Sequence, residues 1–159
     1  MENLISYLND HLAGSVGALE LLDRLIEVYE EKPLGLFFQQ LRNDIHEDQE
    51  KLRDLIHDAG AEESAVRKAG AWLVEKLSRP KMPVSESSDD EMGLFLALEA
   101  LALGIMGKRS LWQALQAALH DIPQLARLDY LELEKRAVEQ YERVERKRLD
   151  IARHVLKAS

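Results

Sequence analysis

Hydrophobic positions recur at the three- and four-residue steps of an amphipathic helix along four long segments of this chain. The first segment ends at Pro33, because proline cannot continue a helix, and the second stops at Gly60, a good C-cap residue. Pro123 suits the first turn of the last segment. The pattern therefore predicts long helices over about residues 4–30, 34–59, 89–120 and 122–156.

The third of these helices contains the most apolar stretch of the chain, residues 92–107. This stretch is too short to span a bilayer, so it indicates a helix buried on most sides in a protein core. Its one charged residue is Glu99. Desolvating a lone carboxylate costs several kcal/mol or more, so we expect Glu99 to be buried within hydrogen-bonding distance of another helix.

Acidic residues also interrupt the hydrophobic stripes of two other predicted helices. Asp48 occupies the position between Ile45 and Leu52 where the pattern requires a hydrophobic residue, whereas His46 and Glu47 point away. In the last helix, Glu134, Glu145 and Arg148 interrupt the face that carries Tyr130 and Val144. We expect a buried polar network that fixes helix register. Its predicted members are Asp48, Glu99, Glu134, Tyr141 and Arg148.

The lengths of the connections predict how these helices are arranged. The first and third connections are short, whereas the second covers residues 61–90 and includes a short amphipathic helix at 61–78. Short links join antiparallel neighbours, and a bundle with one long crossover has the ferritin-like topology. The chain thus resembles the ferritin-like superfamily over nearly its whole length. The predicted fold class is all-α: a ferritin-like four-helix bundle with an extra short helix in the crossover.

The resemblance implies a place for a dimetal site. In that superfamily two helices each provide one Glu, and the other two each provide a Glu-x-x-His motif. Both Glu-x-x-His motifs are missing here, and the five histidines lie off the expected positions. Without imidazole, Fe or Mn would be held by oxygen ligands. We expect no metal or other cofactor, and the candidate ligands, if one is bound, are Glu20, Asp48, Glu99 and Glu134.

Small residues form stripes along the first and third predicted helices. Glycine costs about 1 kcal/mol relative to alanine inside a helix, so its repeated use predicts a close approach of another backbone. A pocket for an apolar ligand beside these stripes is the alternative interpretation. The stripes consist of Ala13, Gly14, Gly17 and Ala18, and of Ala97, Ala100, Gly104 and Gly107.

Composition narrows the class of protein. The chain has 159 residues, which we interpret as one domain over 1–159, and it is 46% hydrophobic and 31% charged, as in globular proteins. A formal net charge of −8 argues against nucleic acid as a partner. The lack of cysteine excludes disulfides and thiolate sites. We expect no membrane-spanning segment and no signal peptide, and therefore a cytoplasmic location.

These observations favour a non-catalytic ferritin-like bundle, a structural, interaction or stress-related protein that has lost its metal ligands. The sequence shows no phosphate loop or nucleophile motif, so we assign no catalytic and no cofactor-binding residues. A metal-dependent oxidoreductase or metal-storage bundle is one alternative, and a carrier of a small apolar ligand is another. The surplus apolar surface of the third helix predicts a homodimer whose interface includes part of the third or the first helix. The alternative is a monomer in which the short helix of the crossover covers that surface.

Overall fold

The computed structural model describes residues 1–61 and 89–157, and over these residues the chain is an all-α bundle of four helices. None of these helices is long and apolar enough to cross a membrane. The predicted helix at 61–78 falls almost wholly outside the described residues. The helices are α1 (Glu2–Val28), α2 (Pro33–Asp58), α4 (Glu91–Ala118) and α5 (Tyr130–Val155), with a 3₁₀ turn, η1, at Pro123–Leu125.

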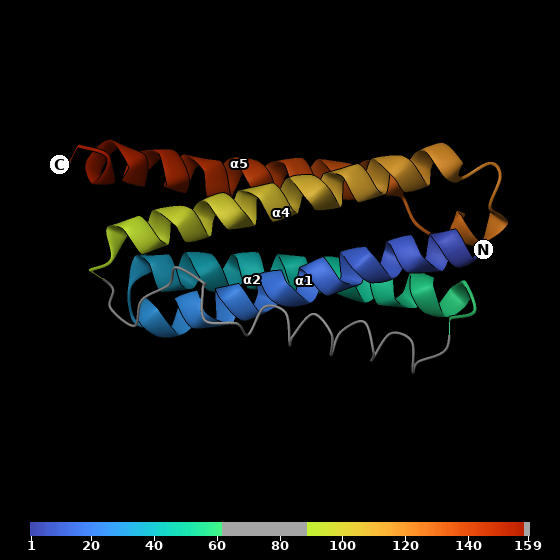
Figure 1. Ribbon diagram of the computed structural model, residues 1–159, viewed down its shortest axis with the longest axis horizontal. Coiled ribbons are helices and arrows are strands. Elements are labelled where there is room, and N and C mark those ends of the chain that lie inside the picture. The colour runs from blue at the N-terminus through green and yellow to red at the C-terminus, as the bar shows by residue number, and fades with distance from the viewer. Residues whose placement is uncertain (62–88, 158–159) are drawn as a thin grey trace.

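The four helices form two antiparallel hairpins, α1 with α2 and α4 with α5 (Figure 1). The hairpins meet along α1 and α4, and η1 lies against α2. Helix α2 ends at the opposite end of the bundle from the start of α4, so these two helices run in the same direction (Figure 1). This is the order that a short, a long and a short connection predict. Leucines dominate the core, among them Leu8, Leu22, Leu41, Leu98 and Leu101.

Helix α5 begins later than the sequence pattern predicts. The predicted helix starts at 122, but Ile122 is extended and Pro123 opens only the short turn η1. Asp129 then caps α5, where its carboxylate accepts a hydrogen bond from the Glu132 amide at 3.0 Å. The hydroxyl of Tyr130 donates to the Leu125 carbonyl at 2.7 Å and closes the turn. Local capping thus overrides the proline as the start signal.

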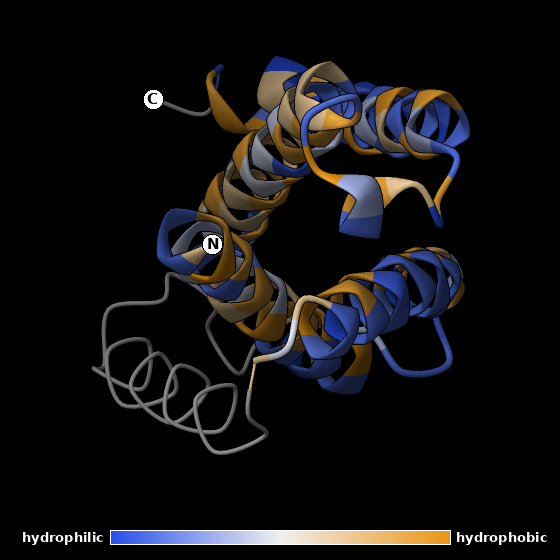
Figure 2. Ribbon diagram, turned by 90° about the vertical axis from the view of Figure 1, so that its right-hand side faces the viewer, coloured by the Kyte–Doolittle hydropathy of each residue, from blue (hydrophilic) through white to orange (hydrophobic). Residues whose placement is uncertain are grey.

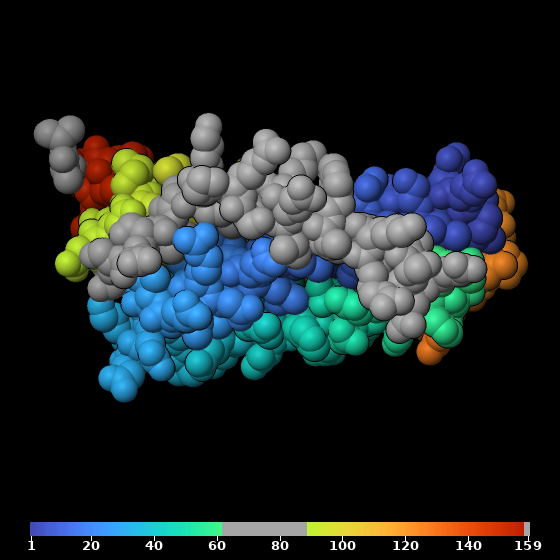
Figure 3. Space-filling model, turned by 60° about the horizontal axis from the view of Figure 1, so that its bottom comes forward, coloured from blue at the N-terminus to red at the C-terminus, as the bar shows by residue number. Residues whose placement is uncertain are grey.

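The second contact between the hairpins, between α2 and α5, is made mainly by long side chains. In the end-on view the ribbons of these two helices stand apart (Figure 2). Arg143 of α5 forms an ion pair with Asp44 of α2, and the Lys147 ammonium lies 5.6 Å from the centre of the Phe37 ring. Charged groups therefore connect α2 to α5, whereas α1 and α2 pack along their length on the face shown in Figure 3.

Three of the four glycines in the small-residue stripes do not mark close backbone approaches. A Cβ atom added to Gly14, Gly104 or Gly107 would meet no atom of the described chain within 4 Å. The prediction of tight packing at these positions is therefore wrong. The close approach lies at Gly35, where a Cβ would overlap the backbone carbonyl oxygen of Tyr29. The turn that ends α1 explains this contact.

We expect alanine to have opposite effects at two of these glycines. Gly104→Ala adds a methyl group in open space and should stabilise the fold by up to about 1 kcal/mol through helix propensity. Gly35→Ala forces the Tyr29 carbonyl to move and should destabilise it by about 1–3 kcal/mol. Urea midpoints of the two variants measure both effects. Equal midpoints would contradict the described packing.

Candidate functional site

The most buried charged residue of the described chain is Asp48, in the middle of α2, with 1% of its surface exposed. Its Oδ2 atom accepts hydrogen bonds from Lys108 Nζ at 2.7 Å and from Gln140 Nε2 at 2.9 Å. Its Oδ1 atom accepts one from Arg136 Nε at 3.1 Å. We call these four residues, Asp48, Lys108, Arg136 and Gln140, the Asp48 cluster. The sequence predicts Asp48 in the core, and the structure places it there.

Members of the cluster also bond to one another, and together they connect three helices. The Lys108 ammonium of α4 donates to the side-chain carbonyl of Gln140 on α5 as well as to Asp48 on α2. Arg136 Nη2 lies 3.3 Å from Glu47 Oε2 at the surface, so the guanidinium joins the buried carboxylate to an exposed one. The cluster therefore holds α2 to the α4–α5 hairpin at the depth of the core.

Burial and neighbouring charges act in opposite directions on the Asp48 carboxyl. Burial alone would raise its pKa, but Lys108, Gln140 and Arg136 together outweigh burial and lower the pKa below its ordinary value. Burial also lowers the pKa of Lys108, against the effect of Asp48. Because the folded-state pKa of Asp48 lies below an unfolded value of about 3.9, the ionised carboxylate stabilises the fold fully above that pH. This contribution is lost as pH falls through the folded-state pKa.

Glu99 does not belong to the Asp48 cluster. Its side chain is 46% exposed, so the prediction of a buried carboxylate is wrong. It accepts a hydrogen bond from Arg148 Nη1 of α5 at 3.2 Å, which is the expected partner on another helix. Arg148 also donates to Glu145 at 2.8 Å and lies over the Phe95 ring. The apolar surroundings of Glu99 in the sequence are misleading because one side of α4 is open to solvent, as Leu103 at 70% exposure shows.

Glu134 and Tyr141, the remaining predicted members of the network, are not part of the Asp48 cluster either. Glu134 is 25% exposed and accepts hydrogen bonds from Arg109 Nε at 3.1 Å and Gln113 Nε2 at 2.7 Å, both on α4. Tyr141 is partly buried against the core. The predicted single network is therefore wrong, because the structure separates Asp48, Glu134 and Glu99 into three groups of partners. As expected, His46, Glu47 and Glu139 are exposed.

The sequence analysis missed the three partners of Asp48. Gln140 shares a helical face with Ala137 and Val144, so its periodicity could have revealed it. The helical periodicity of the sequence does not place Lys108 or Arg136 on a buried face. Their side chains are long enough to bring a charge into the core from partly exposed positions.

The residues around Asp48 do not fit a metal centre. Within residues 1–61 and 89–157, no three His, Asp or Glu side chains converge to hold an ion. Both Asp48 oxygens accept hydrogen bonds, and two of the three donors are cationic groups. Of the other candidate ligands, Glu99 and Glu134 bind different arginines, and Glu20 is a partly buried residue of α1. A metal ion at Asp48 would have to displace Lys108 and Arg136.

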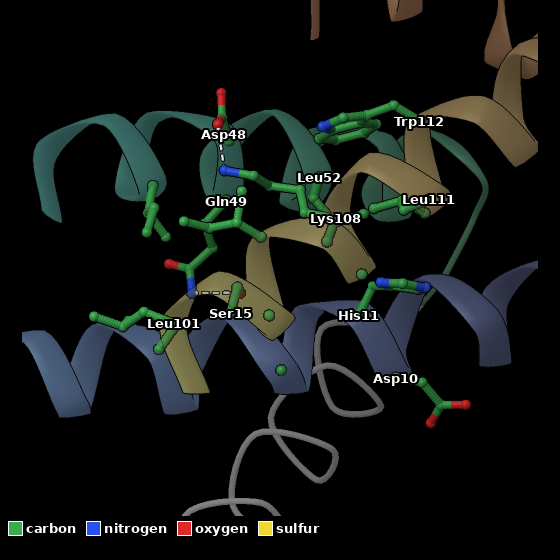
Figure 4. Close-up of a pocket in the computed structure, with 16 residues that line it drawn as sticks. Asp10, His11, Ser15, Asp48, Gln49, Leu52, Leu101, Lys108, Leu111 and Trp112 are labelled. Atoms are coloured by element: carbon green, nitrogen blue, oxygen red, sulfur yellow. Dashed lines mark hydrogen bonds and ion pairs between the residues drawn. The ribbon is translucent and has the colours of Figure 1, made fainter. Parts of the chain in front are cut away.

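A cavity of about 240 Å³ lies beside the Asp48 cluster, between α1, α2 and α4 (Figure 4). Gly14 and Gly104, from the two small-residue stripes, lie on its wall. On the α1 and α2 sides, Gln49 Nε2 donates to the Ser15 hydroxyl at 2.9 Å. Much of the wall is apolar, formed by Ile45, Leu52, Leu101, Ile105, Leu111 and Trp112. The small residues thus leave a volume where the sequence predicted contact.

Comparison with protein-family models, with curated proteins and with solved structures gave no match. These comparisons therefore show no family for this chain. Its function has to be inferred from the Asp48 cluster and from the cavity.

Proposed function

We propose that this chain is a non-catalytic ferritin-like bundle with a structural or interaction role, in which metal ligands have been lost. The observation that carries the proposal is the Asp48 cluster. Asp48 lies in the core, as a ligand of a bundle metal site would, but Lys108 and Arg136 supply the positive charge that an ion would bring. The protein's own cations thus neutralise the carboxylate that metal would otherwise neutralise.

The arrangement of the helices supports the ferritin-like part of the proposal. The helices form two hairpins, with α2 parallel to α4, as a long crossover requires (Figure 1). The rival function, a dimetal oxidoreductase or metal store holding Fe or Mn, needs several carboxylates around one point. Glu99 and Glu134 instead form ion pairs of their own, with Arg148 and Arg109.

Thermal unfolding with added metal tests this proposal. A ligand present at 100 times its dissociation constant stabilises the folded state by about 2.7 kcal/mol. We expect no rise in melting temperature with millimolar Mn²⁺ or with anaerobic Fe²⁺. Asp48→Asn provides the matched control, because it keeps the shape of the side chain and removes its charge. A rise in the wild type that Asp48→Asn abolishes would establish a metal site at Asp48.

We further propose that the bundle forms a homodimer through the open face of α4. Leu96 and Leu103 are both exposed there, and the exposed Ala100 between them would let a second copy approach closely. We expect light scattering at micromolar concentration to give twice the 18.1 kDa of one chain. Leu103→Glu should halve that mass, whereas Leu131→Glu, at an exposed leucine of α5, should not. A wild-type mass of one chain at all concentrations would refute the dimer.

The cavity supports a second candidate function, a carrier of a small apolar ligand. The space of about 240 Å³ opens to solvent beside the exposed Gly14 and Gly104, so it is a surface pocket that a small molecule could enter. Its apolar wall suits a ligand that is itself apolar. This function is compatible with the first, because the Asp48 cluster would hold the helices that form the wall.

A further inference from the structure

One side of α4 carries an uncharged row of residues along the whole helix. Residues three or four positions apart lie on the same face of a helix, and every member of this row is exposed or partly exposed. Leu103, near the middle of the row, is 70% exposed. We call this row the α4 stripe, and it consists of Met92, Leu96, Ala100, Leu103, Gly107, Ser110, Ala114 and Ala118.

Large and small side chains occupy opposite halves of the α4 stripe. All three large residues precede Ile105, and only small residues follow it. Each large residue has a small counterpart at the same distance on the other side of Ile105. These pairs are Leu103 with Gly107, two residues away, Leu96 with Ala114, nine away, and Met92 with Ala118, thirteen away. The α4 stripe is therefore complementary in size to a second copy of itself that runs in the opposite direction.

Gly107 offers the space that this complementarity needs. It is only partly exposed, yet a Cβ atom added there would meet no atom of the described chain within 4 Å. Glycine weakens the interior of a helix relative to alanine, and no contact within the described chain explains its use here. A leucine from a second copy has room at this position.

The charges of α4 follow the same division into halves. Glu91 and Glu99 lie in the first half of the helix, and Lys108 and Arg109 lie in the second. Antiparallel copies of α4 bring the acidic half of one helix against the basic half of the other, whereas parallel copies bring like charges together. Antiparallel helices also place opposite ends of their macrodipoles side by side. Size and charge therefore favour the same direction.

We propose that two copies of this chain pack α4 against α4 in antiparallel directions, about a two-fold axis beside Ile105. In this register Leu103 of each copy packs against Gly107 of the partner subunit, and Leu96 packs against Ala114 of the partner subunit. Ile105 lies near the middle of α4, so the two helices overlap along nearly all of their 28 residues. This inference rests on the homodimer proposed above, and it adds the direction of the helices and the residues that meet.

Cysteine cross-linking tests the register, because the chain has no cysteine of its own. A disulfide requires Cα atoms within about 7 Å of each other. In the proposed register the two copies of residue 96, or of residue 114, lie about 27 Å apart along the helix. Leu96→Cys alone and Ala114→Cys alone should therefore give no disulfide-linked dimer. A mixture of the two variants, oxidised after the subunits have exchanged, should give one.

Leu131→Cys is the matched control for chance collisions. Leu131 is also an exposed leucine, 65% exposed, but it lies on α5. A mixture of Leu131→Cys with Ala114→Cys should give no disulfide-linked dimer under the same oxidation. Cross-linking of the control mixture to the same extent would show that the Leu96→Cys result does not report the register.

Filling the space at Gly107 tests the size complementarity separately. Gly107→Leu places a second large side chain against Leu103 of the partner subunit and should raise the dissociation constant of the dimer about tenfold or more. Leu103→Ala in the same chain makes room again and should recover most of that loss. Sedimentation equilibrium measures both effects. A Gly107→Leu dimer as tight as the wild type would refute the contact between Leu103 and Gly107.

The outcomes separate the register from the dimer on which it rests. If light scattering gives the mass of one chain at all concentrations, both the dimer and the register fall. If the protein is a dimer but Leu96→Cys cross-links alone, or the mixture with Ala114→Cys does not cross-link, the antiparallel register is wrong and the dimer stands. Cross-linking in that mixture alone, together with a loss in Gly107→Leu that Leu103→Ala recovers, establishes the register.

Discussion

Replacing Asp48 by leucine is expected to lower the free energy of unfolding at pH 7 by about 3–5 kcal/mol. The substitution leaves the Lys108 ammonium and the Arg136 guanidinium in a poorly hydrated site without their shared carboxylate. It also leaves the Gln140 amide without an acceptor. Urea unfolding followed by circular dichroism measures the loss, provided that the slope of the transition is unchanged.

Glu134→Leu is the matched control for this substitution. Glu134 also accepts hydrogen bonds from an arginine and a glutamine, but it is partly exposed to water on the side of the bundle. Exposed ion pairs contribute about 0–1 kcal/mol, so this substitution should cost less than about 1 kcal/mol. If Asp48→Leu and Glu134→Leu lower the free energy of unfolding equally, burial of the Asp48 cluster does not explain the contribution of Asp48 to stability.

The double substitution Asp48→Leu with Lys108→Met is expected to recover most of the stability lost in Asp48→Leu alone. The pair of apolar side chains removes both charges that would otherwise be desolvated, and Arg136 keeps its contact with Glu47. Replacing a buried ion pair by hydrophobic residues is often neutral or stabilising. We expect the double variant to lie within about 1–2 kcal/mol of the wild type.

The single variant Lys108→Met completes a double-mutant cycle with Asp48→Leu and the double variant. It leaves Asp48 with Arg136 and Gln140, so it should cost less than Asp48→Leu. The two single effects should therefore exceed the effect of the double variant by about 3 kcal/mol. If the two single effects simply add up to the effect of the double variant, Lys108 and Asp48 act independently. That outcome would contradict the coupling that their 2.7 Å contact predicts.

Much of the fold could be predicted from the sequence because long helices leave a strong periodic signal. The stripe from Ile45 to Leu52 on α2 placed Asp48 in the core even though it is charged. Connection lengths then predicted the direction of each helix. The start of α5 was missed because the capping carboxylate of Asp129 overrides the proline signal.

The candidate site was harder to predict, for two physical reasons. Periodicity locates a Cα position, but the charge of Lys108 or Arg136 lies several bonds away and enters the core from a partly exposed position. Apolar composition, in turn, does not say which side of a helix is covered. Glu99 was therefore predicted to be buried, although it lies on the open side of α4.

The central claim is that Lys108 and Arg136, and not a metal ion, neutralise the carboxylate of Asp48. Elemental analysis tests this claim most directly, on protein purified without chelators and without a metal-affinity column. We predict Fe, Mn and Zn far below one equivalent per chain. One equivalent of any of these metals, lost in Asp48→Asn, would contradict the claim.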